Sequence, residues 1–320
     1  MQTSSRRRLA HALLFIAPAM WAANYLVARL APGIIEPHQL ALMRWSIALL
    51  LMLPFAWSEL RQKSVQWRRE WRGLLVLGAL GMWVCGAFVY IGGHTTSAVN
   101  IGLLYSLAPV LIAVISARLF DDQLRGWQVV GVVLSLLGMV LIVAKGSVQN
   151  LINVQFVSGD LWIITAVLCW TAYSILLRRQ PTSLGPFARL TVICAAGVLV
   201  LIPFTVTEIF LLGPPTDWPA ALTLGITAAV LPGFGAYQAY SFMQRELGAA
   251  RTGLVLYLGP LYAAGAAWLV LSEPPAWYHL AGGLLILPGM YLATRSAGTP
   301  VTQTTQPDNP PGTPVGESAR

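Results

Sequence analysis

Polar and aromatic side chains recur inside segments that are otherwise apolar, and these are the groups able to bind a solute. Asn24 follows Trp21 by three residues, and Tyr173 follows Trp170 by the same interval. Residues three apart share one face of a helix. Since an unpaired amide in hydrocarbon costs free energy, Asn24 is predicted either to bond a neighbouring helix or to line a binding cavity with Trp21, Trp170 and Tyr173.

A second polar face has helical spacing at Tyr237, Tyr240, Ser241 and Gln244. Tyr90 precedes Tyr237 by 147 residues. We expect Tyr90 and Tyr237 to face a water-filled cavity. For Tyr240 and Gln244 the alternative is the aromatic and polar belt at a membrane surface.

Arg44 is a cation inside an apolar segment, where a central charge costs about 2.5 to 3.5 kcal/mol. One interpretation is that it reaches the outer interface along its own stem. The other is that it binds backbone carbonyls or a substrate carboxylate within the bundle. Asn100, which aligns with Arg251 at an offset of 151 residues, is a further candidate for the cavity, whereas Arg251 is interpreted as an anchor at the cytoplasmic surface.

The groups needed for catalysis or metal binding do not come together in this sequence. The twelve acidic residues fall in predicted loops, tails or helix ends, so no deep carboxylate is available as a proton relay. The three cysteines, Cys85, Cys169 and Cys194, lack the spacing of metal ligands. The sequence therefore predicts no enzyme, no metal site and no cofactor.

Composition determines the elements that position these residues. The 320-residue chain is 56% hydrophobic and 10% charged, and each bilayer crossing needs about 20 apolar residues. We predict an all-α integral membrane protein with ten transmembrane helices, over 9–30, 38–57, 73–92, 96–117, 127–144, 159–177, 187–207, 219–241, 249–271 and 277–294. Pro232 and Gly233 interrupt the eighth of these segments.

The two halves of the chain repeat each other. GLLYSLAPVL (102–111) recurs as GLVLYLGPLY (253–262), which aligns Pro109 with Pro260. Because each repeat holds five crossings, an odd number, the repeats must be inverted, as is typical of transporters. The predicted regions are an N-terminal segment, the first repeat, a linker, the second repeat and a disordered tail, over 1–8, 9–144, 145–158, 159–295 and 296–320.

Basic residues predict the orientation. With both termini in the cytoplasm, 17 of the 20 lysines and arginines fall on the cytoplasmic side, and the linker 145–158 is periplasmic. The net charge of +8 is therefore a topology signal and does not indicate nucleic-acid binding. The expected location is the inner membrane of a bacterium.

Proline and glycine predict the mechanics. Pro109 and Pro260 are each interpreted as a hinge, with a static kink as the alternative. Glycines recur seven residues apart at Gly131 and Gly138, and again at Gly282 and Gly289. Such small residues allow close helix contact, which we expect between the two repeats of a monomer, with homodimerisation as the alternative.

Several strings carry a family resemblance. They include WAANYLVARL, ALMRWSIALLLMLP with its arginine and aromatic pair, TSAVNIGLLYSLAPVLIAVISARLF and AGGLLILPGMYLATR. In order and spacing, residues 9–295 resemble the drug/metabolite transporter superfamily, specifically its EamA-like ten-helix members. One departure is Phe120-Asp121-Asp122, where that family usually has Gly-Glu. The resemblance implies an inner-membrane carrier of small metabolites, often an exporter, that works by alternating access.

The resulting hypothesis is a secondary transporter in the lipid bilayer whose partner is a small polar molecule, such as an amino acid. Asn24, Tyr173, Tyr237 and Asn100 would bind this molecule between apolar walls. A nucleotide-sugar or drug carrier of the same superfamily is the main alternative. A membrane enzyme and a non-transporting membrane protein are less well supported, because the chain lacks a catalytic cluster and a soluble signalling module.

Overall fold

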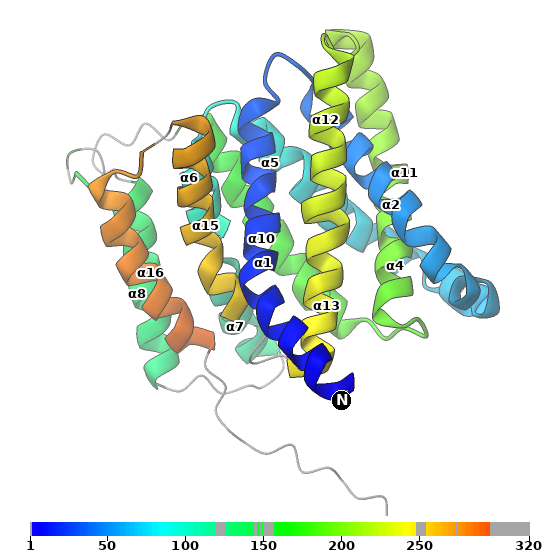
Figure 1. Cartoon of the computed structure of the whole chain (residues 1–320), viewed down its shortest axis with the longest axis horizontal. Coiled ribbons are helices and arrows are strands. Elements are labelled where there is room, and N and C mark those ends of the chain that lie inside the picture. The colour runs from blue at the N-terminus through cyan, green and yellow to red at the C-terminus, as the bar shows by residue number, and fades with distance from the viewer. Residues whose placement is uncertain are drawn as a thin grey trace, which may run out of the picture.

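The regular structure of this protein is helical throughout the part described by the computed structural model (Figure 1). That part comprises residues 2–105, 107–119, 126–143, 146–147, 149, 157–247, 254–272 and 274–294, and it contains no strand. Six of its helices are long and apolar enough to cross a membrane, over Arg6–Leu30, Pro37–Gln62, Trp71–Gly93, Ser158–Arg179, Pro186–Leu212 and Trp218–Tyr240. The protein is therefore a multi-pass membrane protein.

The first half contains α1 Gln2–Leu30, α2 Pro37–Gln62, α3 Ser64–Arg69, α4 Trp71–Gly78, η1 Ala79–Val84, α5 Cys85–Gly93, α6 Ala98–Tyr105, α7 Ala108–Leu119 and α8 Gly126–Val143. The second half contains α10 Ser158–Arg179, α11 Pro186–Leu212, α12 Trp218–Ala228, η2 Ala229–Gly235, α13 Ala236–Leu247, α15 Leu254–Leu271 and α16 Trp277–Thr294. Shorter apolar helices coincide with the predicted fourth, fifth and ninth crossings, so the count of ten stays a prediction.

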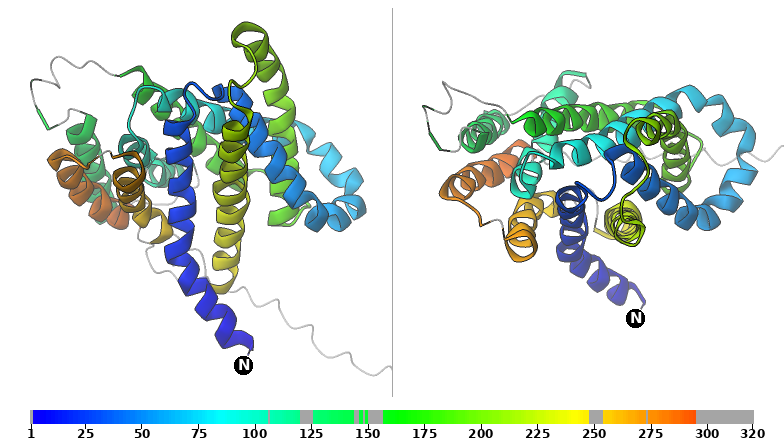
Figure 2. Two further views of the ribbon diagram at one scale, coloured as in Figure 1. Left: turned by 45° about the horizontal axis from the view of Figure 1, so that its top comes forward. Right: turned by 90° about the horizontal axis from the view of Figure 1, so that it is seen from above.

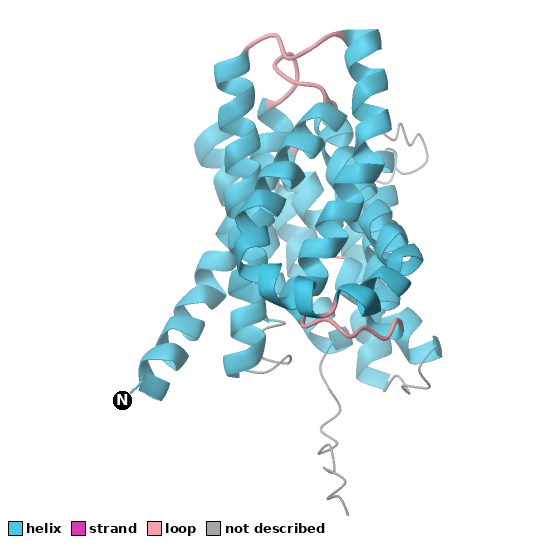
Figure 3. Ribbon diagram, turned by 90° about the vertical axis from the view of Figure 1, so that its right-hand side faces the viewer, coloured by secondary structure: helices cyan, strands magenta, loops and turns pink. Residues whose placement is uncertain are grey.

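The helices form one bundle, with loops at its two ends (Figure 3), and the contacts between helices show that the two halves are interleaved in it. α1 packs against α13 and α15, and α2 packs against α11, so each of these first-half helices contacts the second half. The main core contains Trp45 and Tyr90 among its largest buried side chains. The core is therefore built jointly by the two halves, whose ribbons lie side by side in both views of Figure 2.

The pair α8 and α16 lies at one edge of the bundle, and its glycines make the predicted contact (Figure 1). A Cβ atom added to Gly138 would lie 2.7 Å from the Gly282 carbonyl oxygen. One added to Gly289 would lie 2.6 Å from the Gly131 carbonyl oxygen. The prediction that these glycines join the two halves is confirmed, because only hydrogen fits between the backbones.

The third crossing of each half contains a π-helical segment. η1 lies between α4 and α5, and η2 lies between α12 and α13. Pro232 falls within η2, where the wider helical turn accommodates a residue that has no backbone N–H to donate. The interruption expected at Pro232 and Gly233 is thus a local widening of a helix that continues from Trp218 to Tyr240.

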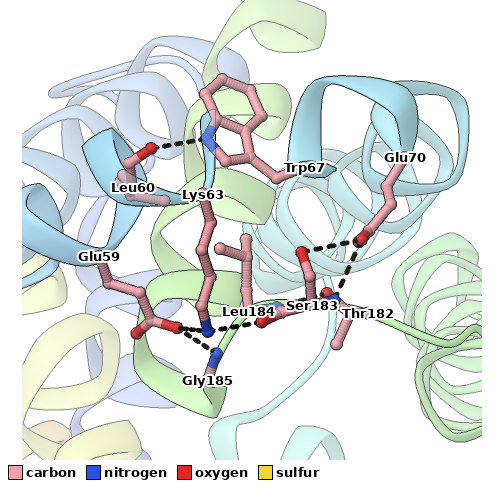
Figure 4. Close-up of polar contacts among 9 residues, drawn as sticks. All are labelled: Glu59, Leu60, Lys63, Trp67, Glu70, Thr182, Ser183, Leu184 and Gly185. Carbon is pink, nitrogen blue, oxygen red and sulfur yellow. Dashed lines mark hydrogen bonds and ion pairs between the residues drawn. The ribbon is translucent and has the colours of Figure 1, made fainter. Parts of the chain in front are cut away.

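One end of α2 is attached to the start of α11 (Figure 4). Glu59 Oε1 accepts hydrogen bonds from the Gly185 backbone N–H at 2.7 Å and from Lys63 Nζ at 2.8 Å. Lys63 Nζ also donates to the Ser183 carbonyl oxygen at 2.7 Å, and Glu70 Oε1 accepts from the Ser183 N–H at 3.1 Å. These bonds satisfy backbone groups of the N-cap residue Gly185 and of the loop just before α11.

The other end of α2 is attached to α11 in a similar way. Glu208 Oε2 accepts the backbone N–H groups of His38 at 2.9 Å and Gln39 at 3.0 Å. The same carboxylate bonds His38 Nδ1 at 2.8 Å through its second oxygen. Thr205 Oγ1 donates to the His38 carbonyl oxygen at 3.1 Å. The α2 and α11 helices are therefore bonded to each other at both ends.

Candidate functional site: a buried arginine among aromatic rings

Three predicted site residues from three different helices meet in one hydrogen-bonded group. Arg44 Nη1 on α2 donates to Asn24 Oδ1 on α1 at 2.9 Å. Tyr90 on α5 donates its hydroxyl hydrogen to the same Asn24 oxygen at 2.9 Å, and Arg44 Nη1 lies 3.4 Å from the Tyr90 hydroxyl oxygen. All three side chains are buried. The structure thus brings Asn24, Arg44 and Tyr90 together.

The guanidinium of Arg44 has no carboxylate partner among the ion pairs of the described residues. Its side chain is only 5% exposed, and its Nε atom has no hydrogen-bond partner there. The guanidinium carbon lies 4.4 Å from the centre of the Trp45 ring, a cation–π contact. Burying a charge with no opposite charge beside it is costly.

This position of Arg44 decides between the two predicted interpretations. A side chain that reached the outer interface would be exposed at its charged end. Arg44 is instead buried and bonded to α1 and α5 within the bundle. The geometry therefore supports a position within the bundle, where the observed partners are the Asn24 and Tyr90 side chains and not the predicted backbone carbonyls.

Aromatic rings surround Tyr237, which lies next to this polar group. The centre of the Tyr237 ring is 6.3 Å from that of Trp21, 6.3 Å from that of Trp45 and 6.5 Å from that of Trp170, with steep angles between the ring planes. Trp170 stacks on Tyr173, with ring centres 5.1 Å apart. The predicted pairs of Trp21 with Asn24 and of Trp170 with Tyr173 therefore belong to one central cluster.

Two glycines allow the third crossing to approach this cluster closely. A Cβ atom at Gly81 would lie 2.8 Å from two carbons of the Tyr173 ring. A Cβ atom at Gly86 would lie 2.8 Å from Nε1 of Trp45, a buried donor that has no partner among the described residues. Larger residues at these positions would push the rings away from Tyr90 and Tyr237.

Three predicted site residues are not part of the hydrogen-bonded group around Arg44. Asn100 Oδ1 lies 3.2 Å from Nε2 of His279, near the start of α16. The Tyr240 ring lies 5.7 Å from Trp21, which places it beside the aromatic cluster, one turn along α13 from Tyr237. Gln244 is also in α13, but its side chain is outside the described part, as are the side chains of Ser241, Pro109 and Pro260.

The two predicted hinge positions have different helical surroundings. α6 ends at Tyr105, Leu107 is a turn residue, and α7 begins at Ala108. Position 109 is thus in the first turn of α7, where a proline costs no helical hydrogen bond. Position 260 lies inside α15, which runs from Leu254 to Leu271. The hinge role stays a prediction for both, and Arg251 lies outside the described residues.

Sequence reasoning missed Trp45 and the neighbouring pair Tyr25 and Tyr105. Trp45 is 2% exposed and contacts both Arg44 and Tyr237. The ring centres of Tyr25 and Tyr105 are 6.0 Å apart. The signal for Trp45 was its place beside the intramembrane arginine, although consecutive residues point about 100° apart on a helix.

Acidic and metal-binding groups are sparse in the described part. Asp160 is the one buried acid there, and it accepts a hydrogen bond from Thr96 Oγ1 at the start of α10. No group of three potential metal ligands occurs among these residues. What the central cluster offers is binding chemistry: a guanidinium, an amide, hydroxyl groups and aromatic faces.

Comparisons with known proteins agree on one class. The chain is 27% identical to the "Uncharacterized transporter YyaM" of Bacillus subtilis (strain 168) over 85% of this chain and 89% of that protein. It is 26% identical to an "Uncharacterized transporter" of Archaeoglobus fulgidus over 89% of this chain and 96% of that protein. A solved crystal structure shares the fold, with a TM-score of 0.58 at 20% identity over 89% and 96% of the two chains.

The family to which the chain belongs is shown by a match over most of its length. The profile of the EamA-like transporter family matches residues 8–144 and again residues 157–295. These two matches coincide closely with the two predicted repeats, and together they cover most of the chain. Internal duplication of this kind is typical of transporters. This chain is a membrane transporter that belongs to the EamA-like transporter family.

Proposed function

We infer that this transporter exports small metabolites that carry a carboxylate, such as amino acids, across the bacterial inner membrane. The observation that carries this inference is the guanidinium of Arg44, which is buried without a carboxylate partner among the described residues. A substrate carboxylate supplies the missing anion. Arginine suits this role because its N–H groups match the two oxygens of a carboxylate.

The aromatic rings supply the rest of the site. Trp21, Trp45 and Trp170 surround Tyr237 and present ring faces and edges close to Arg44. Ring faces attract an ammonium group by about 0.5 to 2 kcal/mol and also bury apolar side chains. A zwitterion with its carboxylate on Arg44 and its ammonium group or side chain among the rings fits this arrangement.

The proposed mechanism is alternating access between two inverted five-helix repeats, in ten crossings with both termini in the cytoplasm. Its support is the basic-residue asymmetry, which favours this orientation. Contributions to the cluster from α1, α2, α5, α10 and α13 also favour a site shared by both halves. Rocking of the repeats about such a site exposes it first to one side and then to the other.

The test is binding to the purified full-length protein, followed by efflux. In a thermal-shift screen, we expect an amino acid to raise the unfolding midpoint (Tm) and its amide, which lacks the carboxylate charge, to leave Tm unchanged. Arg44→Gln should abolish this response, Arg44→Lys should retain part of it, and Arg72→Gln, an exposed control, should retain all of it. Cells that overproduce the protein should release the same compound faster.

Three outcomes would contradict all or part of the proposal. If the amide raises Tm as much as the free acid does, the carboxylate is not recognised. If nucleotide sugars raise Tm and amino acids do not, the alternative substrate class is correct. Faster uptake than release in overproducing cells would reverse the proposed direction while leaving the site intact.

A further inference from the structure

A separate groove lies at the surface of the bundle, between α2, α4 and α11. Its volume is about 630 Å³, which is within the roughly 300 to 1,000 Å³ range of small-molecule sites. Most of its lining is aliphatic or aromatic and includes Leu49, Leu53, Trp57, Ala195 and Leu199. Helices α2, α4 and α11 are all parts of candidate membrane spans, so the groove opens where acyl chains are present.

One end of the groove is basic. Arg61 and Arg68 line it together with Ser64 and Trp67, and no acidic residue does. Both arginines are exposed, and neither takes part in an ion pair among the described residues. The nearby acids Glu59 and Glu70 are bonded to the connection between α10 and α11 instead (Figure 4).

The short helix α3 is held across this basic end. The indole N–H of Trp67 donates to the Leu60 carbonyl oxygen at 3.0 Å, as Figure 4 shows. The guanidinium carbon of Arg68 lies 5.8 Å from the centre of the Trp67 ring. Trp57 and Trp71, which also line the groove, are 58% and 54% exposed. Tryptophan and arginine side chains near the end of a membrane-spanning helix are typical of the level of the lipid headgroups.

We propose that this groove is a binding site for an anionic phospholipid. One acyl chain lies along the apolar lining between α2 and α11, and the phosphate lies between Arg61 and Arg68. Charge complementarity identifies the occupant, because a lipid headgroup with a net negative charge offsets part of the positive charge of the two arginines and a zwitterionic headgroup adds no net charge. This site is distinct from the central cluster around Arg44, and it goes beyond the transport function.

The test is lipid retention by the purified full-length protein. The protein is incubated in detergent with equal amounts of phosphatidylglycerol and phosphatidylcholine and re-purified, and the retained lipids are quantified by mass spectrometry. We expect phosphatidylglycerol to be enriched. Arg61→Gln combined with Arg68→Gln should reduce this enrichment by about fivefold for each arginine removed, since each is worth about 1 kcal/mol near an anionic surface.

Two further variants make the result specific. Arg7→Gln combined with Arg8→Gln removes the same charge far along the chain and should leave the enrichment unchanged. Ala195→Phe fills the groove without changing charge and should reduce retention of phosphatidylglycerol. Monodisperse elution and an unchanged Tm without lipid confirm that each variant is folded.

Three outcomes would overturn the proposal. Equal retention of both lipids by the unmodified protein would remove the anionic specificity. Enrichment that survives in both the arginine pair and the Ala195→Phe variant would locate the lipid elsewhere. Equal loss in the Arg7 and Arg8 control would mean that total charge, and not this groove, selects the lipid.

Discussion

Glu59 and Glu208 make equivalent contacts at opposite ends of the α2 and α11 pair. Glu59 accepts the backbone N–H of Gly185, which precedes α11, and Glu208 accepts that of His38, near the start of α2. The two glutamates are 149 residues apart, the same offset that relates the two halves elsewhere. Each helix therefore caps the start of the other, the reciprocal contact expected of two segments related by a two-fold axis.

Removing either glutamate should destabilise the protein. A carboxylate at a helix start bonds free N–H groups and favours the helix dipole. We expect Glu208→Ala, which loses two backbone bonds and the His38 bond, to cost about 1.5 to 3 kcal/mol for each hydrogen bond to a charged group, measured as a lower Tm in detergent. Glu246→Ala, which removes only the exposed ion pair with Arg6, is the control and should change Tm little. Equal losses in both variants would refute the capping role.

Asn24→Asp should abolish substrate binding while leaving the fold intact. The new carboxylate would lie where Asn24 Oδ1 now lies, 2.9 Å from Arg44 Nη1, and would neutralise the guanidinium from within. Since the Arg44 guanidinium would then be paired with a carboxylate of the protein, it would no longer be available to bind the carboxylate of a substrate. We expect the amino-acid-induced rise in Tm to disappear and the Tm without substrate to stay the same or increase. Unchanged substrate binding would show that Arg44 does not bind the carboxylate.

Gly81→Ala should disturb the aromatic cluster through Tyr173. The added methyl group would lie 2.8 Å from the ring, and overpacking of this kind costs about 1 to 3 kcal/mol. Combining it with Tyr173→Leu should recover part of the loss, which a double-mutant cycle of Tm values measures. Gly265→Ala is the matched control, because no atom lies within 4 Å of its added Cβ. Additive effects of the two substitutions would contradict the contact.

Gly138→Ala should weaken the contact between the two halves without changing the oligomeric state. Its Cβ would lie 2.7 Å from the Gly282 carbonyl oxygen, and a backbone atom cannot move aside as a side chain does. We expect a lower Tm and an unchanged mass by light scattering. Gly283→Ala, on α16 but with no atom within 4 Å of its added Cβ, should have little effect. A change from dimer to monomer would instead assign these glycines to an interface between two proteins.

Much of the site could be predicted because a polar side chain in an apolar membrane segment costs free energy unless it has a hydrogen-bond partner or binds a ligand. Asn24, Arg44 and Tyr90 each stood out on this ground, and they bond one another. The repeat offset likewise relates Trp21 to Trp170, and both rings lie next to Tyr237 in the structure. Asn100 was selected by the same reasoning, yet its partner is His279, since sequence spacing does not tell which neighbouring helix a side chain meets.

The amino-acid sequence by itself determined the class of protein and its internal repeat. Long apolar segments must be helical in a membrane, because only a helix satisfies its own backbone groups there, and this constraint acts locally along the chain. Duplicated motifs are likewise visible without coordinates. Only the tertiary structure decided that Trp45 contacts both Arg44 and Tyr237. It also decided that Glu59 of α2 bonds the start of α11 and that Glu208 of α11 bonds the start of α2. These contacts join residues up to 192 positions apart, and helix packing alone selects which distant side chains meet.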